Sequence, residues 1–134
     1  MQALDVLKQV QSSETIISDQ PQRFSEAACD GDIFRQGDIY IWRRDKLPKS
    51  ANHTKCVLQL APGTTKGSRH CLDSSEGVAM FAVDCADALQ GPWLKLDCER
   101  TITHPEHGDV ICAPGVYEIS FQRAYADELR RVRD

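Results

Sequence analysis

The stretch VYEISFQ, residues 116–122, alternates apolar and polar side chains without a break. Tyr117, Ile119 and Phe121 fall on one side of an extended chain, and the polar residues between them fall on the other. Successive side chains of a β-strand point to opposite faces, so this period of two is typical of a strand with one buried face. The stretch therefore predicts a strand that packs on a hydrophobic core.

Similar short stretches recur through the middle of the chain. They are DIYIW at 38–42, KCVLQL at 55–60, GVAMFAV at 77–83 and PWLKLD at 92–97. The stretch 77–83 is apolar on both faces, which predicts a strand buried on both sides. Glycine- and proline-rich turns separate the stretches, among them PGTTKGS, which we interpret as a hairpin loop. The pattern predicts an all-β fold, a barrel or sandwich of about seven short antiparallel strands.

The two ends differ from the middle. Apolar residues at helical spacing near the start predict a helix within an N-terminal arm, residues 1–35. The β domain is expected at 36–123, and the tail 124–134 is expected to form a short helix. At 134 residues the chain is long enough for one domain with its own core.

Composition limits the classes of function. The formal net charge of -4 argues against a protein that coats nucleic-acid phosphates. We find no positively charged leader and no apolar run of membrane-spanning length, so we expect a soluble, cytoplasmic protein. The six cysteines include no CxxC pair, and we expect them to be free thiols packed in strands as small hydrophobic residues.

The stretch THPEHG, residues 103–108, holds two of the four histidines. Pro105 suits a turn, so His104 and His107 are expected to close a hairpin with Cβ atoms about 5 Å apart. With His70 they form a candidate metal site for zinc, iron or manganese, to which Glu106 or Asp109 could add a carboxylate. The alternative is that each histidine caps a turn or makes a surface hydrogen bond.

The stretch GDVICAPGVYEIS, residues 108–120, resembles the second sequence motif of the cupins. Tyr117 stands where that motif has a histidine ligand, which makes it a candidate auxiliary residue. The first cupin motif needs HxH and a glutamate, whereas GSRHCL supplies only His70. The resemblance implies a β-barrel more than a metal enzyme.

An ordered set of short motifs is similar to a family of small, uncharacterised bacterial proteins. The motifs are QGD, GSRH, THPEH, PGVY and a final RRVRD, spread over residues 36–134. Many members carry GHxH where this chain has Ser68 and His70. The resemblance implies a topology and candidate positions, but no activity.

Basic and aromatic residues form a candidate single-strand nucleic-acid face. Small β-barrels stack bases on aromatic rings and bind phosphates with arginine. Acidic residues lie between these basic ones, so an ion-paired surface is the alternative. The residues are Trp42, Arg43, Arg44, Arg123, Tyr125, Arg130, Arg131 and Arg133.

No stretch of the sequence matches a catalytic motif that would indicate a reaction. A GxSxG nucleophile elbow and a phosphate-binding GK[ST] loop are both missing, so we assign no catalytic residue. We expect a non-catalytic binding or accessory module whose histidine-bearing turns contact a protein partner or build a homo-oligomer. The alternatives are a three-histidine metalloenzyme acting on a small molecule and a nucleic-acid-binding barrel.

Overall fold

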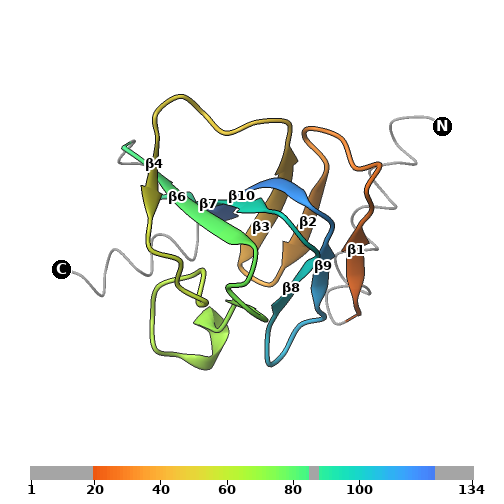
Figure 1. Ribbon diagram of the computed structural model, residues 1–134. Helices are drawn as coiled ribbons and strands as arrows, with labels where there is room; N and C mark the ends of the chain where they lie inside the picture. Colours follow the sequence, from red (N-terminus) through yellow and green to blue (C-terminus); the bar gives the residue numbers. More distant parts are fainter. Residues whose placement is uncertain (1–19, 85–87, 123–134) are drawn as a thin grey trace, which may run out of the picture.

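A computed structural model describes residues 20–84 and 88–122 of the chain. These residues form two β-sheets and one short 3-10 turn, η1 (Lys66–Ser68). In Figure 1 the larger sheet spreads from β4 at the left to β2, and β8, β9 and β1 of the smaller sheet lie at the right. The expected all-β fold is confirmed, in a sandwich-like form.

Six strands make up the larger sheet, in the spatial order β2-β3-β10-β7-β6-β4, and all neighbours are antiparallel. The smaller sheet has the order β1-β9-β8-β5, in which only the β1–β9 pair is parallel. The bounds are β1 Gln22–Phe24, β2 Ile33–Gln36, β3 Ile39–Arg44, β4 Ala51–Thr54, β5 Cys71–Leu72, β6 Val78–Val83, β7 Gln90–Leu96, β8 Arg100–Thr103, β9 Val110–Cys112 and β10 Gly115–Phe121.

Strand β10 lies in the middle of the larger sheet, between β3 and β7. The alternation in the sequence is borne out, because Tyr117, Ile119 and Phe121 are buried while the polar residues between them are partly exposed. Apolar side chains of both sheets complete the core. They include Phe24, Ile39, Ile41, Leu72, Leu94, Leu96, Ile102 and Val110.

Tyr117 is a core residue that joins two segments. Its ring packs edge-to-face on Phe24 of β1, with centroids 5.1 Å apart. Its hydroxyl donates a hydrogen bond of 2.7 Å to the carbonyl of Ala113, just before β10. Burial raises the pKa of this hydroxyl, so it keeps its proton and its role as donor.

The predicted strand at 55–60 is wrong. The chain leaves β6 after Thr54 and runs beside β5, where Leu60 N–H donates to His70 O and Leu72 N–H donates to Leu58 O. Because β5 is only two residues long, this pairing amounts to an isolated bridge rather than a strand. Leu58 is consequently exposed although its spacing suggested a buried face.

Two further expectations need correction. Strand β6 is not buried on both faces: Met80 is its one buried residue, and the opposite face, which carries Ala79, Phe81 and Val83, is only half-buried. The cysteines are only partly strand residues, since Cys71 and Cys112 lie in β5 and β9 but Cys56 and Cys98 lie in loops.

The predicted helices near the two ends lie outside the described residues. Within the predicted arm 1–35, β1 and the first three residues of β2 are sheet strands. The domain limits themselves stay a prediction. Across the described residues, no helix has the length and apolar character needed to cross a bilayer.

Replacing Tyr117 with phenylalanine tests the link from β10 to Ala113. The buried carbonyl of Ala113 loses its hydroxyl donor, so we expect Tyr117→Phe to lower the free energy of unfolding by about 1–2 kcal/mol. Tyr40→Phe is the matched control, because Tyr40 is half-buried in β3, and we expect a change within about 0.5 kcal/mol. Urea denaturation measures both, and equal losses would contradict the assignment.

Candidate functional site

Strand pairing brings two histidine-bearing turns together. In the β5–β8 pair, Cys71 lies opposite Thr103. The residue before Cys71 is therefore adjacent to the residue after Thr103, and these are His70 and His104. Their rings lie 4.4 Å apart between centroids, and the ring of His107 lies 4.7 Å from that of His104.

The hairpin that carries His104 and His107 is longer than expected. Strands β8 and β9 do pair, but their last paired residues are Ile102 and Val110. His104 and His107 thus lie in a loop, not at the closing pair of the turn. Their rings nevertheless lie in contact, tilted by 35° to each other.

Gln36 fixes the orientation of the His70 ring. The Gln36 amide nitrogen donates to the carbonyls of Ile102, at 2.8 Å, and Gly108, at 2.9 Å. Its oxygen therefore faces His70 Nδ1, 2.9 Å away, and can only accept. His70 must carry its proton on Nδ1, which leaves a lone pair on Nε2.

His70 stays neutral at physiological pH. Its side chain is fully buried, and burial together with the neighbouring His104 and His107 lowers its pKa to about 3. Its Nε2 atom is shielded from solvent and has no hydrogen-bond partner among the described residues. A buried acceptor without a hydrogen-bond partner typically costs about 1–3 kcal/mol of stability.

Both ring nitrogens of His104 are engaged. Nε2 lies 3.0 Å from the carbonyl of Gly67, so it must donate, and Nδ1 accepts from the backbone N–H of Glu106 at 3.0 Å. His104 therefore joins the 3-10 turn to its own loop. This is the turn-capping role that was the alternative to metal binding.

His107 packs against the turn between β2 and β3. Gly37 in that turn has a φ of +57°, and a Cβ placed on it would lie 2.6 Å from Cδ2 and Nε2 of His107. Glycine thus serves two needs here, the left-handed backbone and the close approach of the ring.

The predicted metal residues are only partly brought together. His70, His104 and His107 converge, but among residues 20–84 and 88–122 no three histidine, cysteine or carboxylate side chains are arranged to hold a metal. Glu106 and Asp109 are exposed. Tyr117 lies in the core with its hydroxyl committed to Ala113.

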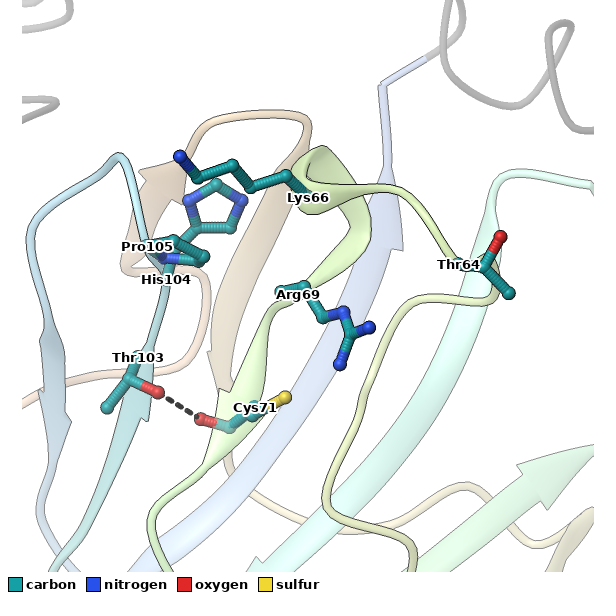
Figure 2. Close-up of a pocket in the computed structure, with 7 residues that line it drawn as sticks. All are labelled: Thr64, Lys66, Arg69, Cys71, Thr103, His104 and Pro105. Carbon is teal, nitrogen blue, oxygen red and sulfur yellow. Dashed lines mark hydrogen bonds between the residues drawn. The ribbon is translucent and has the colours of Figure 1, made fainter.

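An open hollow of about 620 Å³ lies between the two histidine-bearing turns. In Figure 2 the side chain of Lys66 extends toward the turn of His104 and Pro105, while Arg69 projects from the segment before Cys71. The lining residues are Thr64, Lys66, Arg69, Cys71, Thr103, His104 and Pro105.

The lining of the hollow is basic. Lys66 and Arg69 are exposed, and in the described part of the chain neither forms an ion pair. No carboxylate belongs to the lining, although the whole chain has a net charge of -4. Sequence reasoning missed both cations, because PGTTKGS, residues 62–68, was interpreted as a hairpin loop and Arg69 follows it directly. Two basic residues in a glycine-containing turn that leads to a histidine were the available signal.

The candidate nucleic-acid face is only partly described. The indole N–H of Trp42 donates to Ser120 Oγ at 2.9 Å, and Arg44 lies over the indole ring. Arg44 also pairs with Glu118 at 2.9 Å, as the alternative of an ion-paired surface expects. Arg43 donates to the carbonyls of Arg44 and Val116. Residues 123–133 of this face lie outside the described residues, so the face stays a prediction.

Residues 35–122 match a family described as a domain of unknown function, DUF8820. The chain belongs to this family. The match confirms an uncharacterised family, while the motif set and the cupin resemblance stay predictions. No curated protein and no solved structure matches the chain.

The DUF8820 match covers the whole site. Gln36, both histidine-bearing turns and the hollow fall inside it. It begins at the next-to-last residue of β2, so β1 lies outside it.

Two glycines with positive φ offer a matched test of how His107 is seated. Gly37→Ala and Gly31→Ala both place a side chain on left-handed backbone, but only Gly37 has the His107 ring within 4 Å. We expect Gly37→Ala to lose about 1 kcal/mol or more beyond Gly31→Ala in the free energy of unfolding. It should also shift the imidazole resonances of His104 and His107. Equal losses, or unmoved resonances, would show that His107 is not held by this turn.

Proposed function

We propose that this protein is a non-catalytic binding module for a small molecule that carries a carboxylate or phosphate group. The ligand would occupy the hollow between the turn 64–69 and the turn 103–105. The single observation that supports the proposal is the pair of cations, Lys66 and Arg69, in a hollow that no carboxylate lines.

Charge is the main argument. In a chain of net charge -4, basic side chains usually find acidic partners, as Arg23 does with Glu99 and Arg44 with Glu118. Lys66 and Arg69 do not form such pairs in the described residues, so their donors are available to a ligand. Arginine matches the two oxygens of a carboxylate or phosphate, and lysine adds a point charge.

Hydrogen bonds of the lining residues His104 and Thr103 favour a fixed shape of the hollow. His104 lines the hollow and is held at both nitrogens, by Gly67 and by the backbone of Glu106. Thr103 Oγ donates to the carbonyl of Cys71 at 3.2 Å and ties the two strands under the hollow. Preformed sites bind with less loss of conformational freedom than flexible ones.

Titration with inorganic phosphate and with citrate tests the proposal and separates the two ligand chemistries. We expect one of them to shift the backbone amide resonances of residues 64–71 and 103–105. Each charge-assisted contact contributes about 1.5–3 kcal/mol, so Lys66→Ala/Arg69→Ala should weaken binding about 100-fold or more.

Lys46→Ala/Lys49→Ala is the matched control. This variant also removes two positive charges, but from exposed positions in the loop between β3 and β4, outside the hollow. We expect it to change the affinity less than threefold. Equal weakening in both double variants would indicate general charge attraction, and no amide shift with either anion would overturn the proposal.

The other functional hypotheses stay predictions. They are the cupin-like three-histidine metalloenzyme, the nucleic-acid face and the contact with a protein partner or second copy of the chain. The cytoplasmic location and the bacterial origin likewise stay predictions.

A further inference from the structure

The two histidine-bearing turns are joined by contacts between side chains rather than by a long strand pair. His104 Nε2–H donates to the carbonyl of Gly67 in the 3-10 turn, and the ring of His104 packs on that of His70. Both nitrogens of His104 are engaged, since its Nδ1 accepts from the backbone N–H of Glu106. The turn 62–70 is therefore closed onto the loop 103–109 mainly through imidazole rings.

His70 is the ring in this contact that must stay uncharged. Its side chain is fully buried and donates Nδ1–H to Gln36, so a second proton would put a positive charge on the shielded Nε2. The carbonyl of Gly67 favours the charged form, but it already accepts from His104. Burial and the two neighbouring histidines outweigh this carbonyl and lower the pKa of His70 to about 3.

The charged groups around the rings do not offset such a charge. Two of them are exposed cations of the hollow, and the two carboxylates of the loop 103–109 are exposed to solvent. In residues 20–84 and 88–122 no carboxylate is hydrogen-bonded or ion-paired to His70 or His104. Strand β5 adds only the thiol of Cys71. The charged residues on the turn 62–70, the loop 103–109 and the β2–β3 turn are Lys66, Arg69, Glu106, Asp109, Arg35 and Asp38.

We infer that the contact between the turn 62–70 and the loop 103–109 is an acid-sensitive latch, which is closed while His70 is neutral and opens when His70 takes a second proton. Both segments line the hollow, so opening the latch changes its shape. The inference does not depend on the proposed function, because the latch acts whether or not an anion binds in the hollow.

Little else holds this part of the structure closed. Strand β5 has only two residues, which pair with β8 on one side and lie beside the segment 58–60 on the other. In the larger sheet, β3 and β10 share six paired positions. Regions with few paired residues open at a lower free energy than the centre of a sheet. The latch therefore opens locally, while the larger sheet stays folded.

Proton linkage gives the direction of the effect. In the open state His70 is solvated and has the ordinary histidine pKa of 6.5, against about 3 in the closed state. Above pH 6.5 the ring is neutral in both states, so pH has no effect on the latch. Below pH 6.5 the open state binds one more proton, and its population rises by up to about tenfold per pH unit as the pH falls toward 3.

Amide hydrogen exchange of the full chain at pH 7 and pH 5 tests the inference. The N–H groups of Leu60 and Leu72 report the latch, because they donate to the carbonyls of His70 and Leu58 on the two sides of the contact. After correction for the intrinsic pH dependence of exchange, we expect their protection factors to fall about 20-fold between pH 7 and pH 5.

The amides of β3 and β10 are the internal control, and their protection factors should stay within about threefold. An equal fall in these strands would indicate global unfolding and would overturn the inference. Unchanged protection at Leu60 and Leu72 would overturn it as well.

His70→Asn separates the latch from other titrating groups. Asparagine can still donate to Gln36 but takes no proton, so the change at Leu60 and Leu72 between pH 7 and pH 5 should shrink to less than about threefold. His53→Asn is the matched control, because His53 is exposed in β4 and packs on Phe81. It should keep the wild-type pH dependence, and the same dependence in both variants contradicts the latch.

Imidazole nitrogen spectra of the wild-type protein give a second measurement that needs no variant. We expect the closed state at pH 5 to keep His70 neutral, with its proton on Nδ1. A His70 ring that becomes charged near pH 6.5 while Leu60 and Leu72 stay protected would overturn the inference, even if His70→Asn does not fold.

Discussion

The side-chain amide of Gln36 is the polar contact on which the arrangement of the two sheets and the histidines depends. It leaves the edge strand β2 of the larger sheet and reaches the carbonyl of Ile102 in β8 of the smaller sheet. It also holds the loop carrying His107 through Gly108, and it orients His70. The hydrogen bonds to Ile102 and His70 are buried and the one to Gly108 is partly buried, so the low local dielectric strengthens them.

The position of the histidines follows from the register of one very short strand pair. Strand β5 is two residues long, yet its pairing with β8 sets His70 beside His104. The bonds from Leu60 and Leu72 along the 58–60 segment hold the other side of β5. The hollow and the ring cluster therefore belong to one junction between turns: the hollow is open and lined by two cations, whereas the ring of His70 is fully buried.

Local sequence patterns predicted the strands that have their own alternation, such as β3 and β10. They failed for 55–60, because exposure there depends on how long a partner strand is. The sequence spacing permitted the three histidines to converge but did not require it. The register between β5 and β8 places His70 beside His104. The role of Gln36 was missed because its partner, the carbonyl of Ile102, lies 66 residues away in the sequence. The role of Arg69 was missed because it depends on the absence of a carboxylate from the lining of the hollow, which only the structure shows.

The segment shared with the DUF8820 family is shorter than the unit that must fold. It omits β1, whose Phe24 ring covers Tyr117 and whose backbone pairs with β9. A fragment cut at residue 35 would leave β9 as a bare sheet edge beside an uncovered aromatic ring, and such edges recruit other chains. Any shortened version of the protein should therefore start ahead of β1, or aggregation will be mistaken for assembly.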